Sequence, residues 1–286
     1  MGYLSQKKRQ KNIRELLNVS VVVLSICCAL VLFLSSSSAG MFVNRWLFQI
    51  YLYTLFIMLY ALFNKFFWHA GGLLIFSFLL FLNIGMGSNL FFDVQTTGLQ
   101  SIKILYQSDI EKIQDTEKQI KRYGVDVAGL ILDSQQKLKN LIMTPHKILR
   151  MGDILLSVTC RAGFAEIDIN STRMIFITLD FSKQAMNEKR AALKNLAEFV
   201  NMQDVPVIIA GNFGQEAWSK SFLEFLEKTG LEVKNRVLLS NGRIRFNPFV
   251  VPEMNVLAYK DFGIRDISFL SAKDNLNHPL LFELNY

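Results

Sequence analysis

Three long apolar runs fill the first third of the chain, and short apolar and polar segments alternate through the rest. The runs are Leu16–Leu34, Trp46–Phe63 and Phe66–Phe92. The first has no charged residue and, as a helix, is long enough to cross the hydrocarbon core of a bilayer, which is about 30 Å thick. Because only two residues separate the other two runs, we expect these to form a tight helical hairpin. The pattern predicts a membrane anchor of three transmembrane helices over residues 16–92.

A basic head, residues 1–15, precedes the first run and sets the expected topology. Its positive residues are Lys7, Lys8, Arg9, Lys11 and Arg14. Basic flanks tend to stay in the cytoplasm, so we expect a cytoplasmic N-terminus and, after three crossings, an extracytoplasmic segment 93–286. The alternative is a cleaved signal peptide, but the apolar core of such a peptide usually spans about 7–15 residues and needs no further apolar runs after it. The lipid bilayer is therefore an expected partner.

Residues 93–286 alternate between segments of strand and helix character. Strands are expected at Ser101–Tyr106, Val125–Leu132, Ile154–Cys160, Ala165–Ile169, Met174–Leu179, Val205–Ala210, Leu231–Val233, Val237–Leu239, Arg243–Phe246, Val256–Ala258, Ile264–Phe269 and Leu280–Leu284. Helices are expected at Asp109–Tyr123, Gln135–Ile142, Glu188–Val200 and Ser219–Lys228. In Glu188–Val200, Ala191 and Leu196 belong to an apolar face, and the charges are expected on the other face. Many short strands with interspersed helices predict one α/β domain.

Composition locates the charge and narrows the functional classes. The net charge of +7 lies almost wholly in the first 92 residues, whose one acidic residue is Glu15, so the segment 93–286 is close to neutral. A nearly neutral domain without a long basic run gives no strong signal for nucleic-acid binding. Cys160 is the one cysteine beyond the anchor, so no disulfide can form within the domain.

The segment Gly211–Ser219 reads GNFGQEAWS and follows a β-branched apolar run that ends at Ala210. It resembles the Gly-Asp-Phe-Asn-Ala-Thr-Pro-Trp-Ser stretch of membrane-anchored bacterial members of the endonuclease/exonuclease/phosphatase (DNase I-like) superfamily. The resemblance is specific over 205–222 and loose over 101–286. It implies a four-layer α/β/β/α sandwich, a place in the bacterial inner membrane, and phosphoester hydrolysis with one or two Mg²⁺ ions and a His–Asp pair.

The polar positions depart from the pattern of that family. Asn212 stands where the family has an aspartate, Asp180 where it has a histidine, and Asn255 where it has a second histidine. Asp133 is the candidate metal ligand near the position of the family's glutamate, although an N-cap of the helix expected at 135–142 is an equally good interpretation. An amide brings no charge to a metal or an imidazolium, so these changes remove electrostatic stabilisation.

The segment Asn275–Leu280 resembles the C-terminal Ser-Asp-His-x-Pro-Leu motif of that family and can be aligned with it in two registers. Without a gap, Leu276 and Asn277 take the places of the family's Asp and His. If one residue before Pro279 is deleted, Asn277 falls on the Asp and His278 on the catalytic His. In that register His278 would contact the phosphate, but with the neutral Asn277 as its partner.

Some positions do match the pattern of that family, and these are residues that form turns or pack in the core. They include Gly211, Phe213, Trp218, Phe222 and Pro279. The resemblance therefore implies a retained fold with an altered site.

Two functions follow from the sequence. The first is a catalytically silent or impaired domain that acts as an extracytoplasmic binding or scaffolding module for an unknown protein or phosphate-containing ligand, with no cofactor expected. The alternative is a divergent Mg²⁺-dependent phosphodiesterase, phosphatase or nuclease. In either case the candidate catalytic positions are His278, Asn212 and Asp180, the candidate substrate-binding positions are Asn255, Asn277 and Trp218, and the candidate metal ligand is Asp133.

Overall fold

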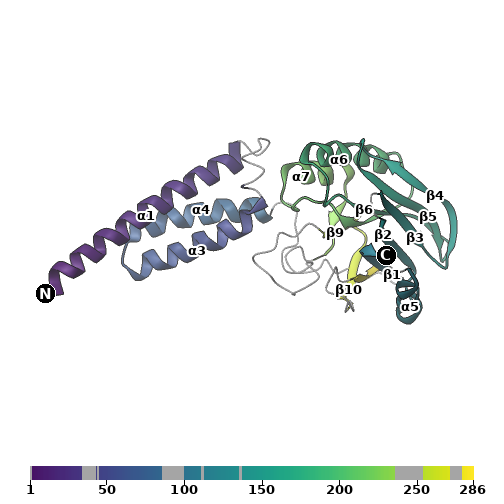
Figure 1. Ribbon diagram of the computed structural model, residues 1–286, viewed down its shortest axis with the longest axis horizontal. Helices are drawn as coiled ribbons and strands as arrows, with labels where there is room; N and C mark the ends of the chain where they lie inside the picture. Colours follow the sequence, from purple (N-terminus) through teal and green to yellow (C-terminus); the bar gives the residue numbers. More distant parts are fainter. Residues whose placement is uncertain are drawn as a thin grey trace. The chain divides into compact units, whose positions relative to one another are not determined.

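The structure is a computed structural model that describes residues 2–33, 43, 45–85, 100–110, 113–134, 137–235, 254–270 and 279–286. It consists of two compact units: residues 1–86 with the short segment 218–220, and the remaining residues. Three apolar helices form the N-terminal part, and two sheets with their helices form the C-terminal part (Figure 1).

The N-terminal helices are α1 (Gly2–Phe33), α3 (Leu47–Phe63) and α4 (Phe67–Gly85). They coincide with the three apolar runs, although α1 also includes the basic head and residues 86–92 lie outside the described part. Over Lys8–Val31 and Phe67–Ile84 the helices are long and apolar enough to cross a membrane, whereas α3 has only 17 residues. Within the described residues, two helices thus qualify as candidate spans in place of the expected three, and α3 is a shorter apolar helix.

These helices pack against one another through stripes of mostly apolar residues and direct other large apolar side chains outward. Along α4 the buried positions recur every three or four residues, at Ala70, Leu73, Ser77, Leu80 and Ile84. The other side of α4 exposes Leu74, Ile75, Phe78 and Phe81. Large apolar side chains that face outward are typical of helices in a lipid environment, where the surroundings are as apolar as the side chains themselves.

The C-terminal unit contains two sheets. Sheet A joins, in spatial order, β10 (Gly263–Phe269), β11 (Leu280–Asn285), β1 (Ser101–Ile110), β2 (Val127–Ser134) and β3 (Lys137–Met143). Sheet B joins β4 (Lys147–Leu155), β5 (Arg161–Ile169), β6 (Thr172–Asp180), β7 (Val207–Asn212), β9 (Met254–Ala258) and β8 (Glu232–Val233). The helices are α5 (Ile113–Tyr123), α6 (Met186–Asn201) and α7 (Lys220–Thr229).

The two sheets stack face to face around a shared apolar core. Ile104 and Ile131 of sheet A contribute to this core together with Ile167, Phe176 and Ile208 of sheet B. Helix α5 covers the outer face of sheet A, and α6 and α7 cover the outer face of sheet B (Figure 1). The expected four-layer α/β/β/α sandwich is confirmed.

The helix expected at Gln135–Ile142 is wrong. Residues from Lys137 onward form β3, which pairs antiparallel with β2 so that Asp133 faces Leu138. Leu, Lys and Gln in this segment have good intrinsic helix propensities, but a neighbouring strand offers backbone partners and a core to cover, which outweighs a weak local preference. The strand expected at Ile154–Cys160 is also displaced: β4 ends at Leu155, and the next residues turn back, with Leu156 N–H donating to Cys160 O.

Helix α6 is confirmed, but its predicted face is wrong at two positions. Ala191 is exposed, and Lys189 is buried with the apolar residues. The strands expected at Val237–Leu239 and Arg243–Phe246 lie outside the described residues.

Candidate functional site

Strands β6, β7 and β9 bring three of the predicted site residues to one edge of sheet B. The parallel pair β6 and β7 ends in register, with Asp180 opposite Asn212. The antiparallel strand β9 begins at the same edge, with Met254 opposite Asn212 and Asn255 opposite Gly211. Residues far apart in the sequence therefore meet where the two parallel strands end.

The side chains of Asp180 and Asn212 are each bound to the loop that follows them. Asp180 Oδ1 accepts a hydrogen bond from Ser182 N–H at 2.9 Å, and Asn212 Oδ1 accepts one from Gly214 N–H at 2.9 Å. The main chains are joined too, since Phe181 N–H donates to Asn212 O at 2.7 Å. These Asx-type turns fix both loops and occupy one oxygen of each side chain.

Tyr106 joins the two sheets at this edge. Its buried hydroxyl donates to Leu179 O (3.1 Å) and lies 3.3 Å from Asn212 N–H, which donates to it. The next side chain, Gln107, turns the other way and accepts from Thr116 of α5. A tyrosine at the end of a strand was visible in the sequence, but only the stacking of the sheets shows that it reaches the site.

Lys189 of α6 is a cation of the site that the sequence pattern did not reveal. Its side chain is 5% exposed, and its Nζ donates to Gly214 O at 2.7 Å. Gly214 has a φ of +59°, and a Cβ there would lie 2.5 Å from Lys189 Nζ and from Phe181 O. Only glycine fits this position without strain, so the loop packs directly onto the lysine.

Asn255 is fully buried, at 0% exposure, and its amide nitrogen and oxygen have no hydrogen-bond partner in the described part of the chain. Strand alternation places it on the opposite face from Met254, which packs against the core between the sheets. Asn255 therefore pairs with Gly211, one residue before Asn212, and its side chain lies on the face of the sheet opposite to that of Asn212. Its role in binding stays a prediction.

For the remaining predicted site residues the structure gives only the position in the fold or no description. Trp218 is buried in the turn before α7. The backbone of Asp133 lies in β2, so its alternative role as a helix N-cap is wrong, because no helix follows it. Asn277 and His278 lie outside the described residues.

The described side chains do not make a site that fits Mg²⁺. This ion prefers near-octahedral coordination by oxygen, with one or more carboxylates. Within the described ranges no group of three or more His, Cys, Asp and Glu side chains could hold a metal ion. Asp180 gives one of its oxygens to a turn, and Asn212 is neutral.

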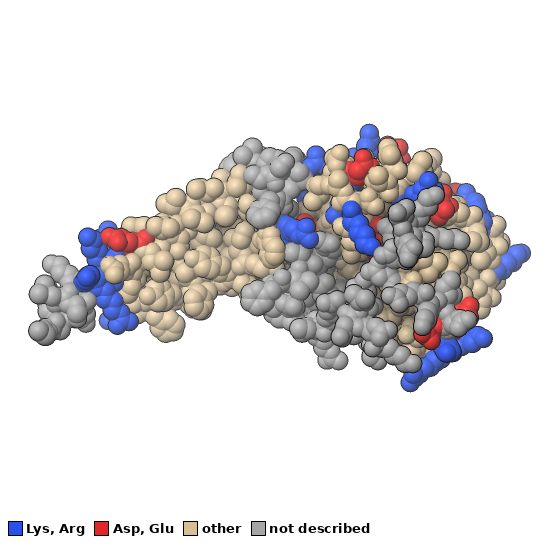
Figure 2. All heavy atoms as spheres, in the orientation of Figure 1, with Lys and Arg blue, Asp and Glu red and all other residues tan. Residues whose placement is uncertain are grey.

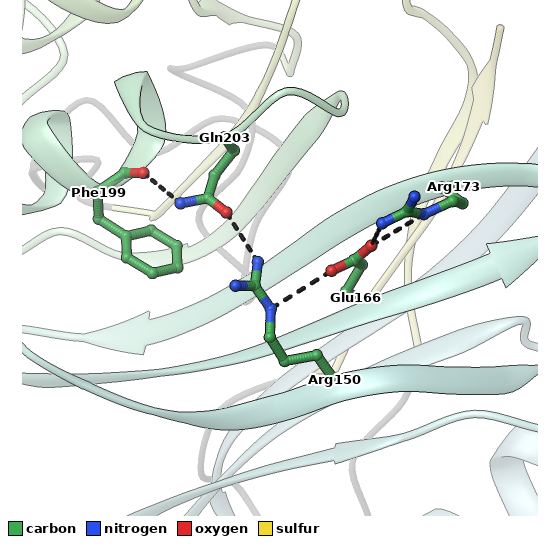
Figure 3. A network of polar contacts seen from close by, with 5 residues as sticks. All are labelled: Arg150, Glu166, Arg173, Phe199 and Gln203. Carbon is green, nitrogen blue, oxygen red and sulfur yellow. Dashed lines mark hydrogen bonds and ion pairs between the residues drawn. The ribbon is translucent and has the colours of Figure 1, made fainter.

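A second polar cluster lies on the outer face of sheet B (Figure 3). Buried Glu166 accepts hydrogen bonds from Arg173, one of them from Nε at 3.0 Å, and lies 3.3 Å from Arg150 Nε. The hydrogen bond to Glu166 raises the pKa of Arg173. Arg150 Nη2 also donates to Gln203 Oε1 at 2.9 Å, and Gln203 Nε2 donates to Phe199 O at 2.7 Å. Two guanidinium groups neutralise the buried carboxylate, and one of them also binds Gln203 next to α6. We therefore interpret the cluster as a structural link between β4 at the edge of sheet B and α6.

A histidine–aspartate pair that the sequence analysis missed lies elsewhere. His146 Nε2 is 2.9 Å from Asp126 Oδ1, and Asp126 Oδ2 accepts from Lys103 N–H. Asp126 precedes β2 and contacts Lys103 at the start of the parallel strand β1, whereas Tyr106, further along β1, contacts Asn212 at the end of β7. The pair therefore lies at the end of the sandwich opposite the candidate site.

Comparison with known proteins identifies the fold. No protein-family model matches the chain, and no curated protein matches it by sequence. The structure is similar to an endonuclease/exonuclease/phosphatase from Beutenbergia cavernae, with a TM-score of 0.51 and 10% identity over 65% of this chain and 72% of that chain. It is similar to an endonuclease/exonuclease/phosphatase from Bacteroides vulgatus, with a TM-score of 0.50 and 10% identity over 65% of this chain and 99% of that chain. The C-terminal unit thus has the DNase I-like fold, as the resemblance implied.

Proposed function

We propose that the chain is a membrane-anchored DNase I-like domain whose site binds a protein or a phosphate-containing ligand and has lost, or nearly lost, metal-dependent hydrolysis. The observation that carries this proposal is the pairing of Asp180 with Asn212 at the ends of β6 and β7. A carboxylate and a neutral amide stand together there, and each uses an oxygen to hold its own loop.

Hydrolysis of a phosphoester needs positive charge at the site, and this requirement is the physical reason for the proposed loss of activity. A phosphoester transition state gathers negative charge, which fixed cations and a metal held by carboxylates must offset. Asn212 brings no charge, and the buried ammonium of Lys189 is turned to a backbone carbonyl.

Membrane anchoring is supported by the surface of the helices. Only 28% of each candidate span is buried, and the exposed faces carry large apolar side chains. The core helix of a soluble protein buries such residues, so this pattern favours contact with lipid. We propose a multi-pass protein of the bacterial inner membrane, with the N-terminus in the cytoplasm and the domain outside it.

A fusion after Tyr286 tests this topology. A reporter enzyme that is active only outside the cytoplasm should be active at that junction, because the basic head holds the N-terminus inside and we propose that the 17-residue α3 crosses together with α1 and α4, which makes three crossings. The same reporter fused after Lys65, between α3 and α4, serves as the control and should be silent. Activity of a cytoplasm-only reporter after Tyr286 would reverse the proposed orientation.

Thermal unfolding tests the state of the site. Mg²⁺ at one hundred times its Kd would stabilise the fold by about 2.7 kcal/mol. We expect no such gain for the full chain at millimolar Mg²⁺, and the same melting temperature for Asp180→Asn with and without the ion. A large Mg²⁺-dependent rise in the parent chain that Asp180→Asn abolishes would show that the site still holds a metal.

A further inference from the structure

Basic residues gather at one end of the helical unit. Lys8, Arg9, Lys11 and Arg14 are exposed on α1, and Lys65 is exposed in the turn between α3 and α4. Figure 2 shows the α1 charges at the N-terminal end of the unit, beyond a long uncharged surface. These five residues are called the basic collar below.

The packing of the helices puts Lys65 beside the α1 residues of the collar. Ile13 and Leu17 of α1 belong to one apolar cluster with Ala61, Ala70 and Phe66, which flank the α3–α4 turn. His69 Nε2 is also 2.8 Å from Asn18 Oδ1. The turn therefore lies at the level of residues 13–18, where the charged part of α1 meets its apolar part (Figure 1).

Aromatic side chains mark the same level. Trp68 is 94% exposed and Phe63 is 85% exposed, and both are within three residues of Lys65. Aromatic residues, Trp above all, collect where the hydrocarbon of a bilayer meets the headgroups. The collar is thus placed at the depth of the lipid phosphates.

The protein itself does little to neutralise the collar. Glu15 is the one acidic residue near it, and its 3.9 Å contact with Lys11 joins two highly exposed side chains, so solvent weakens it. Lys8, Arg9 and Arg14 form no ion pair with a carboxylate of the described residues. The backbone of Lys65 has a φ of +64°, a conformation that costs less free energy for glycine or asparagine than for lysine. A charged residue nevertheless occupies this position.

We propose that the basic collar binds the phosphate groups of anionic phospholipids in the leaflet around it. The inference rests on the proposed membrane anchoring and adds a preference among lipids to it. Each Lys or Arg near a membrane surface adds to the attraction for anionic lipid, and the attraction decays within a Debye length.

Energy transfer from tryptophan tests the proposal with the full chain in phosphatidylcholine vesicles. A small fraction of dansyl-labelled phosphatidylglycerol is compared with the same fraction of dansyl-labelled phosphatidylcholine. We expect about threefold more transfer to the anionic probe at low ionic strength, falling towards equality in high salt. The variant Lys8→Gln, Lys11→Gln, Arg14→Gln and Lys65→Asn should lose this excess. Asparagine suits the left-handed turn, so the variant keeps the backbone of the α3–α4 turn.

A matched variant removes four charges from the C-terminal unit, by Lys118→Gln, Lys121→Gln, Lys147→Gln and Lys194→Gln, and should keep the excess. Equal transfer to both probes in the parent chain, or an excess lost equally in both variants, would overturn the proposal. Flotation with the phosphatidylcholine vesicles distinguishes a failure of membrane anchoring from a failure of lipid preference. A chain that does not float refutes the anchoring, whereas a chain that floats with no preference refutes only the collar.

Discussion

Gly211→Ala is expected to destabilise the C-terminal unit more than any other single methyl added in the strands of the candidate site. A Cβ at Gly211 would lie 2.3 Å from Leu179 O, a backbone atom of the adjacent strand, and 2.9 Å from the Leu179 side chain. Because β6 and β7 are paired at this point, neither backbone can withdraw without breaking the ladder. Overpacking of this kind costs about 3 kcal/mol or more, out of a total stability of about 5–15 kcal/mol.

Thermal unfolding of the full chain measures the effect. For a unit of this size 3 kcal/mol corresponds to a fall in Tm of about 6–12 °C. Gly152→Ala in β4 is the matched control, because its Cβ would meet only the Phe164 ring, at 3.2 Å, and a ring can move aside. Equal melting temperatures for the two variants would show that the strands do not approach as closely as described.

Lys189→Met is expected to loosen the loop that follows Asn212. Methionine fills much of the same space, but it leaves Gly214 O without the donor that Lys189 Nζ provides at 2.7 Å. An unsatisfied buried carbonyl costs about 1–3 kcal/mol. Lys194→Met, at an exposed position of the same helix, should change the free energy of unfolding by much less.

Chemical unfolding compares the free energies of unfolding of the Lys189→Met and Lys194→Met variants. Removing a buried charge can also stabilise a protein, since the cost of desolvating the charge disappears. A Lys189→Met variant as stable as Lys194→Met would therefore mean that this hydrogen bond does not hold the loop.

The sequence predicted those parts of the fold that depend on long or strongly patterned segments. The apolar runs gave the helices of the N-terminal unit, and the β-branched run before Gly211 gave the central strand β7. Asp180 and Asn212 could be selected as candidate positions because each ends a strand that resembles a strand of a known family. That the two strand ends lie opposite each other is seen only in the structure.

The remaining features depend on contacts that no local pattern contains. β3 is a strand because β2 lies beside it, although its residues also fit a helix. Lys189 was assigned to the solvent face because it is charged, but the carbonyl of Gly214 stabilises it inside. The roles of Tyr106 and of the His146–Asp126 pair depend on which end of the sandwich they occupy, and only the stacking of the sheets sets that.

Whether the domain has lost metal-dependent hydrolysis is best measured by a turnover assay. The full chain, purified in detergent with Mg²⁺, is offered DNA, RNA, inositol phosphates and simple phosphodiesters. We expect no metal-dependent hydrolysis by the parent chain and none by Asn212→Asp, because one restored carboxylate cannot replace residues that act as a unit. Metal-dependent turnover by the parent chain that disappears in His278→Ala would instead show that the domain is a working hydrolase.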